Sequence, residues 1–198
     1  MAKETASQHK RTQPIHNSPV SQPATSSKKK GIWTSISNKF KSFDIGYFAT
    51  LGPLGFFPKG PGTIGSLVAL PVAYLLNKLY LPALWIFALI MFFVGLKAVQ
   101  KYTADKVEKD PGCVIIDEFV GQMIPFMVII PELLHASIIF LAFALFRLFD
   151  IFKFGPVAMY DRRKNPVGVM MDDVVAGIFA GFILAMLQLC IFNNVYGM

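Results

Sequence analysis

The stretch CVIIDEFVGQMIPFMVII, residues 113–130, decides how this chain must fold. It is apolar enough to enter a bilayer, yet Asp117 and Glu118 stand side by side near its start. A charged side chain within a membrane segment is costly, and such residues almost always face the interior of a helix bundle or a water-filled cavity. The segment therefore predicts a membrane helix whose charged end has a function.

The composition of the whole chain is that of an integral membrane protein. Of its 198 residues, 54% are hydrophobic and only 16% are charged. Apolar runs of roughly 20 residues, the length that crosses a bilayer, recur through residues 64–192 and are missing from residues 1–44. We therefore expect an all-α polytopic membrane helix bundle over residues 45–198, preceded by a disordered basic tail over residues 1–44.

The tail is rich in Ser, Thr, Pro and Lys, so it cannot bury enough apolar surface to fold. It lacks the apolar region of a signal peptide, and its single arginine disfavours an organellar transit peptide. Its last residues suit a short amphipathic helix on an anionic membrane surface, or else an unstructured linker. The apolar positions that recur there at helical spacing are Ile32, Trp33, Ile36, Phe40 and Phe43.

Proline, glycine and charged residues divide the apolar sequence into about five membrane spans. The connections around LYLPA and PELLH are so short that each must join two helices in a hairpin. The expected helices are 64–82, 83–100, 114–131, 132–150 and 171–192.

The basic residues indicate the orientation of these spans. With the N-terminus in the cytoplasm, residues 1–63, 97–109 and 147–164 place 18 of the 19 Lys and Arg residues on that side. Only Lys78 then lies on the far side, a bias typical of membrane proteins. We expect a cytoplasmic N-terminus and a far-side C-terminus. The net charge of +7 then reflects contact with anionic lipid headgroups, and nucleic acid binding is not indicated.

This topology gathers the charged residues of three helices at their cytoplasmic ends. Asp117 and Asp173 each have a glycine four residues later, so they lie where helices can approach closely. Arg147 and Asp150, three residues apart, share one helix face. The expected catalytic residues are Asp117, Glu118, Arg147, Asp150, Asp172 and Asp173.

One internal arginine cannot neutralise five carboxylates, so the layer needs a further cation. Oxygen ligands without nearby His or Cys suit a hard divalent ion such as Mg²⁺. The pattern favours metal-assisted attack by water, or less readily by an aspartate, on a phosphoryl group. Interhelical salt bridges without catalysis are the alternative. The expected metal ligands are Asp117, Glu118, Asp150, Asp172 and Asp173.

The stretch PGTIGSL, residues 61–67, would complete such a site from the same side of the membrane. Backbone N–H groups at a helix start bind anions, although a Gly/Ser start is usually only a helix cap. The expected phosphate-binding residues are Gly62, Thr63, Gly65 and Ser66, with Lys153 adding positive charge.

Four motifs, PGTIGSL, IIDEFVG, FRLFDIFK and MMDDVVAG, resemble in order and spacing those of the phosphatidylglycerophosphatase A family. The resemblance covers roughly residues 45–192. It implies a Mg²⁺-dependent phosphatase of the bacterial inner membrane that converts the phospholipid phosphatidylglycerophosphate to phosphatidylglycerol. In that family a Lys-Pro pair usually follows the FD motif, whereas this chain reads KFGP at residues 153–156.

Two other functions stay open as alternatives. Acidic layers also form ion pathways in transporters, although transporters place polar groups near the membrane midplane at interrupted helices. A membrane phospholipid phosphotransferase would also bind metal through aspartates, but its DG-x2-AR pattern is absent from the sequence. The sequence does not indicate an oligomeric state.

Overall fold

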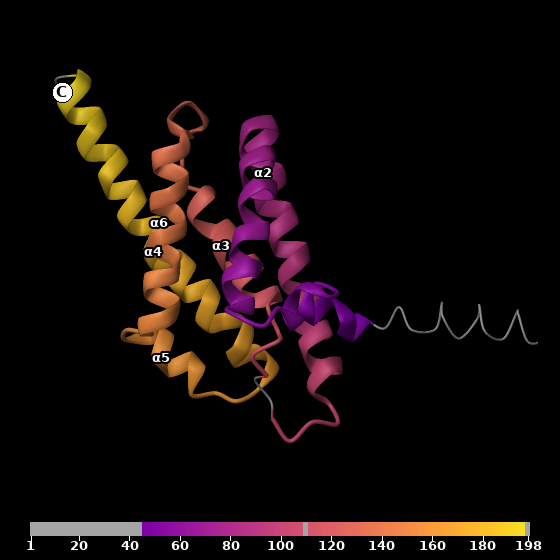
Figure 1. Cartoon of the computed structure of the whole chain (residues 1–198). Helices are drawn as coiled ribbons and strands as arrows, with labels where there is room; N and C mark the ends of the chain where they lie inside the picture. The colour runs from indigo at the N-terminus through magenta and orange to yellow at the C-terminus, as the bar shows by residue number, and fades with distance from the viewer. Residues whose placement is uncertain (1–44, 109–110, 197–198) are drawn as a thin grey trace, which may run out of the picture. The chain divides into compact units, whose positions relative to one another are not determined.

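The computed structural model describes residues 45–108 and 111–196, which form a bundle of helices (Figure 1). No strand occurs within these residues, so the all-α prediction is confirmed. The disordered tail and surface helix predicted for residues 1–44 lie outside the described residues. The main helices are α2 (Pro61–Thr103), α3 (Ile116–Phe126), α4 (Ala136–Phe152), α5 (Pro156–Asp161) and α6 (Pro166–Tyr196). The short 3-10 helices are η1 (Ile45–Thr50), η2 (Leu54–Phe56) and η3 (Pro131–Leu133).

α2 consists of two antiparallel arms, residues 61–79 and 81–103. Tyr80 has φ −164° and ψ 96°, values outside the helical range. Gly65 of the first arm packs against Ile115. Gly95 of the second arm packs against Ile116, although a continuous helix would separate the two glycines by about 45 Å. The chain therefore turns back at Tyr80, as the predicted hairpin requires (Figure 1).

α3 is shorter than the span predicted over residues 114–131. It ends at Phe126 after 11 residues. A helix of that length rises about 17 Å, which does not cross a hydrocarbon core of ~30 Å. The prediction of a helix to residue 131 is wrong, because the backbone after Phe126 bonds to side chains of neighbouring helices.

Two amide side chains hold the backbone of this non-helical segment. Asn77 of α2 donates to two of its carbonyls, at 2.7 and 3.0 Å. Gln188 of α6 accepts from one of its N–H groups at 2.9 Å and donates to a third carbonyl at 3.1 Å. Irregular backbone at membrane depth is tolerated where protein groups satisfy it in this way. The backbone groups bound belong to Phe126, Val128, Ile129 and Ile130.

Two helices within the described residues are long and apolar enough to cross a membrane: α2, and α6 over Pro166–Asn193. Only 17% and 33% of their most apolar stretches are buried, unlike the core helices of a soluble protein. α4 also presents large apolar side chains outward, among them Phe140 and Ile151. These observations support a membrane protein, and the number of five spans stays a prediction.

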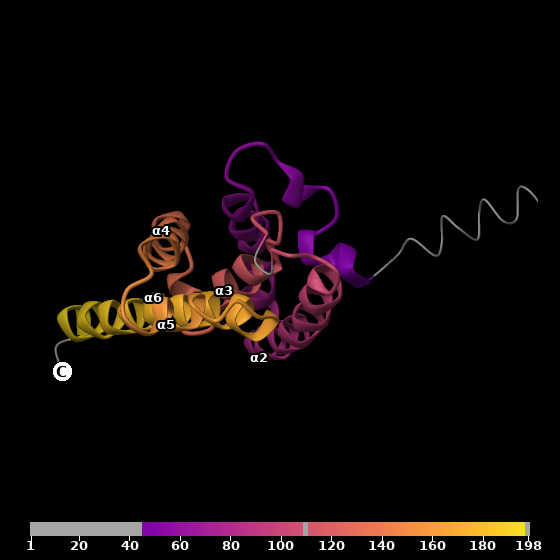
Figure 2. The same ribbon diagram turned by 90° about the horizontal axis from the view of Figure 1, so that it is seen from below.

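The 3-10 helices η1 and η2 precede α2 and pack near the start of α3. The Ile115 N–H donates to the Ala49 carbonyl at 2.9 Å, and Gly46 lies against Tyr102 near the end of α2. Seen from the end of the bundle, α3 lies between α2 and α6 (Figure 2). These contacts anchor the loop that leads into α3.

α3 and α6 approach each other at glycines. A Cβ atom on Gly121 would lie 2.7 Å from the Asp173 carbonyl oxygen. A Cβ atom on Gly177 would lie 2.4 Å from the Gly121 carbonyl oxygen, so only glycine fits without a shift of backbone. The predicted seam of small residues beside the acids is confirmed. It brings the start of α3 against the helix that carries Asp173.

Replacing Gly177 by Ala is expected to lower the free energy of unfolding by about 1–3 kcal/mol, because the added methyl group meets backbone. Gly181→Ala on the same helix is the matched control, since its Cβ atom would lie 3.6 Å from the nearest atoms, an ordinary contact. Thermal unfolding of both variants in detergent measures the difference. Equal stability of the two variants would show that the seam is loose.

Candidate active site

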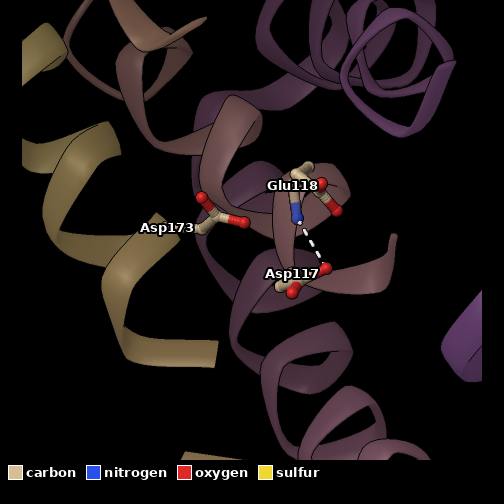
Figure 3. A group of neighbouring side chains, drawn as sticks. All are labelled: Asp117, Glu118 and Asp173. Atoms are coloured by element: carbon tan, nitrogen blue, oxygen red, sulfur yellow. Dashed lines mark hydrogen bonds between the residues drawn. The ribbon is translucent and has the colours of Figure 1, made fainter. Parts of the chain in front are cut away.

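Three carboxylates converge where α3 begins beside α6 (Figure 3). Oxygen atoms of Asp117, Glu118 and Asp173 all lie within 4.8 Å of one another. Asp117 is 7% exposed and Asp173 is 3% exposed. Three of the five predicted metal ligands therefore form one compact group.

The first turn of α3 supports two of these carboxylates. The Glu118 N–H donates to Asp117 Oδ1 at 3.1 Å (Figure 3). The N–H groups of a first helical turn have no partner within the helix, and the helix dipole favours negative charge there. The helix start thus offsets part of the cost of burying Asp117 and Glu118.

Two carboxylate oxygens of this group are buried and have no hydrogen-bond partner among the described residues. They are Glu118 Oε2 and Asp173 Oδ1, which come from different helices. Buried charges in proteins are normally paired or bound to metal ions. The group offers oxygen ligands only, the kind that Mg²⁺ prefers. These residues therefore fit a hard divalent cation.

Asp150 is held by Arg147, outside this compact group. Arg147 Nη1 lies 2.5 Å from Asp150 Oδ2, so the predicted pair on α4 is confirmed. The charge of Asp150 still acts on Glu118 and Asp173. Asp150 therefore belongs to the same electrostatic cluster, although its nearest partner is the arginine.

Asp172 is paired with Lys153, which was predicted to bind phosphate. Lys153 Nζ lies 3.0 Å from Asp172 Oδ2 and 2.5 Å from Asp161 Oδ1. Burial alone would lower the pKa of Lys153, but its bonds to the two aspartates raise this pKa above its ordinary value. The hydrogen bond that Asp161 accepts from Lys153 lowers the pKa of Asp161. A charged bridge therefore links the turn after α4 to α5 and α6.

The KFGP turn that departs from the family pattern has an unusual backbone. Lys153 ends α4 in the left-handed region, with φ 47° and ψ 51°. Gly155 has φ 52° and ψ −118°, a conformation that side chains other than hydrogen rarely allow. This turn places Lys153 between Asp161 and Asp172.

The cluster has fewer cations than carboxylates. Its five carboxylates meet two cations, Arg147 and Lys153, within the described part of the chain, and Lys153 also pairs with Asp161 outside the cluster. Removing the partner of a buried charge is strongly destabilising, so unpaired buried acids need compensation. Interhelical salt bridges alone do not account for the arrangement.

The start of α2 lies against the same carboxylates. A Cβ atom on Gly62 would lie 2.0 Å from Glu118 Oε1 and 3.5 Å from Arg147 Nη1, so a side chain here would displace the Glu118 carboxylate. Ser66 Oγ accepts from Arg147 Nη1 at 3.4 Å and donates to the Gly62 carbonyl at 3.1 Å. Two of the predicted phosphate-binding residues are thus brought to the cluster.

The other two residues of this turn have different neighbours. Gly65 packs on the loop before α3, where a Cβ atom would lie 2.7 Å from the Ile115 carbonyl oxygen. Thr63 Oγ1 lies beside Gly60, which caps the helix in the left-handed region. Close packing explains Gly65, and phosphate binding by this turn stays a prediction.

Gln122, one helical turn after Glu118, was not among the predicted residues. It is 0% exposed, and neither polar atom of its side chain has a partner among the described residues. Burying an amide without a hydrogen bond costs about 1–3 kcal/mol. Residues four apart share a helix face, so the spacing from Glu118 was the available signal.

Comparison with known proteins identifies the family. The sequence matches phosphatidylglycerophosphatase A over residues 47–188, a range that includes every residue of the cluster. The chain belongs to the phosphatidylglycerophosphatase A family. It is therefore a phosphatase, a phosphoric monoester hydrolase, as the motifs predicted.

Three relatives resemble most of the chain. A phosphatidylglycerophosphatase A of Haemophilus influenzae is 39% identical, covering 68% of this chain and 82% of its own length. The Escherichia coli protein of that name is 29% identical, covering 75% and 83%. A Bacteroides thetaiotaomicron protein named "Putative phosphatidylinositol-3-phosphatase" is 38% identical, covering 66% and 85%. No solved structure matches the chain.

Replacing Gln122 by Met is expected to keep or raise the melting temperature, because the change removes an unpaired buried amide. If the amide supports Glu118 as an outer partner of a metal ligand, phosphatase activity should fall roughly 10–100-fold. Met123→Leu, a change at the equally buried neighbour, is the control and should alter neither value. A less stable Gln122→Met protein with full activity would assign the amide to structure.

Proposed function

We propose that this chain hydrolyses phosphatidylglycerophosphate to phosphatidylglycerol and phosphate, with Mg²⁺ held by Asp117, Glu118 and Asp173. The observation that carries this proposal is the pair of buried, unpartnered oxygens, Glu118 Oε2 and Asp173 Oδ1, within one compact group. Family membership and the names of the H. influenzae and E. coli relatives support the substrate.

The five carboxylates would have two roles: three would bind the ion directly, and two would act around it. A bound Mg²⁺ would supply charge stabilisation for phosphoryl oxygens and a more acidic water. Asp117, Glu118 and Asp173 would hold it. Asp150 is oriented by Arg147, and Asp172 by Lys153. Both would bind the ion's waters or complete its ligand set.

Arg147 and the start of α2 would receive the phosphate of the substrate. The guanidinium has five N–H donors in a fork that matches phosphate oxygens. Arg147 bonds to Asp150 and Ser66 through Nη1. These two bonds hold the guanidinium group between α4 and α2. N–H groups at a helix start also attract phosphate, and α2 begins beside Glu118 and Arg147 at Gly62.

We further propose that the site faces the cytoplasm at the bacterial inner membrane, and that about five spans cross it. The distribution of 18 of 19 basic residues supports this orientation. A site at headgroup depth would let a lipid present its phosphate without leaving the bilayer.

A second lipid phosphomonoester should be tested as a substrate. The name of the Bacteroides relative favours phosphatidylinositol 3-phosphate as the alternative substrate of this fold. Both lipids carry a terminal phosphate on a membrane-anchored head group, so the carboxylate cluster alone does not discriminate between them. Purified full-length protein should release phosphate faster from phosphatidylglycerophosphate, and a preference for the inositol lipid would replace the proposed substrate.

Glu118→Gln and Asp173→Asn are expected to lose at least about 100-fold in activity, because the amides keep the shape but remove charge that stabilises the transition state. Both should also lose the rise in melting temperature that Mg²⁺ causes in the unchanged protein. Glu132→Gln and Asp105→Asn, at exposed acids, are the controls. Full activity in excess chelator would refute the metal requirement.

Arg147→Lys keeps the charge and removes the planar fork, so kcat is expected to fall by roughly 100-fold with a smaller change in KM. Arg163→Lys, at an exposed arginine, is the matched control. A variant that raised only KM would mean that Arg147 helps to bind lipid and does not stabilise the transferring phosphoryl group.

A further inference from the structure

A groove of about 510 Å³ lies between the second arm of α2, α3 and α6. Its lining comes from an eight-residue stretch of each helix: 85–92, 120–127 and 171–178. Eight helical residues rise about 10 Å. The side chains that line it are aliphatic, aromatic or thioether groups.

The three stretches are in register along the bundle. Gly95 lies against both Ile116 and Met170, so the second arm of α2 descends toward the starts of α3 and α6. The groove residues can therefore be assigned to two ends. At one end are Phe92, Val120 and Met171, and at the other are Trp85, Met127 and Ile178.

The first of these ends adjoins the carboxylates. Val120 lies one turn after Asp117 on the same face of α3, and Val174 directly follows Asp173 on α6. Both valines line the groove. A phosphate bound at Asp117 and Asp173 would therefore have an apolar path leading away from it along the bundle.

The other side of the groove opens to the surroundings of the bundle. Ile86 and Leu89 are each 59% exposed and Ile178 is 54% exposed, and all three line it. These residues belong to the two helices that are apolar and long enough to cross a membrane. A hydrocarbon chain can thus enter sideways from the bilayer.

We propose that this groove holds one acyl chain of the phospholipid substrate and so positions the phosphate at the carboxylates. The inference rests on the proposed function, because only a phospholipid joins an acyl chain and a phosphate through one glycerol unit. Moving a chain from lipid into an apolar groove gains little hydrophobic free energy. The groove therefore acts by orientation, and an ångström of misplacement can reduce turnover about 100-fold.

The test fills the groove and compares two substrates. Leu89→Trp and Ile178→Trp place a larger side chain in the groove. Leu75→Trp and Ile90→Trp are the controls, because these residues have similar exposure but do not line the groove. The ratio of kcat/KM for a long-chain substrate to that for a dibutyryl analogue should fall at least about tenfold in the groove variants only. Equal losses on both substrates, in variants with unchanged melting temperature, would overturn the inference.

A second measurement needs no variant and no turnover. A phosphatidylglycerophosphate probe with a photoreactive group in one acyl chain should crosslink to residues 120–127 or 171–178 of the unchanged protein, and the matching phosphatidylcholine probe should not. Equal labelling by both probes would identify an ordinary membrane lipid as the occupant and reject the proposal. Absence of phosphate release from every lipid tested, by contrast, would reject the proposed function itself.

Discussion

Repulsion between buried carboxylates is the constraint around which this bundle is organised. Like charges repel weakly in water but strongly where the local dielectric constant is low. Arg147 and Lys153 each pair with one acid of the cluster. The remaining three meet within 4.8 Å because Gly121 and Gly177 let the backbones of α3 and α6 approach closely. The close helix contact at the glycines therefore comes with a crowding of acids that lowers stability, as is common at functional sites.

Features set by local spacing were predictable from the sequence. The short connection around LYLPA indicated the reversal near Tyr80, and the i, i+4 spacing of Asp173 and Gly177 indicated a close helix contact. The pairing of Arg147 with Asp150 followed in the same way from helical geometry. Each of these depends on residues within about one or two turns of each other, where helix geometry alone decides which side chains meet.

Features set by distant partners were not predictable. At the end of α3, next to Pro125, Asn77 donates to the Phe126 carbonyl from 49 positions earlier in the chain, and no local signal indicates that bond. Lys153 binds Asp161 and Asp172, so its partners could be predicted only with the positions of α5 and α6 known. The burial of the Gln122 amide was not predictable either, because a single polar residue in an apolar helix does not indicate which neighbours surround it.

The irregular segment after α3 also constrains the order in which the protein can be assembled. Its backbone is satisfied by Asn77, which precedes it, and by Gln188, which lies near the end of the described chain. During synthesis, the segment would enter the membrane before the helix that carries Gln188 exists. Until that last helix arrives, exposed backbone groups in hydrocarbon favour an open arrangement. The carboxylate group has the same requirement, because α6 also supplies Asp173, so the three acids can meet only after that helix has been made.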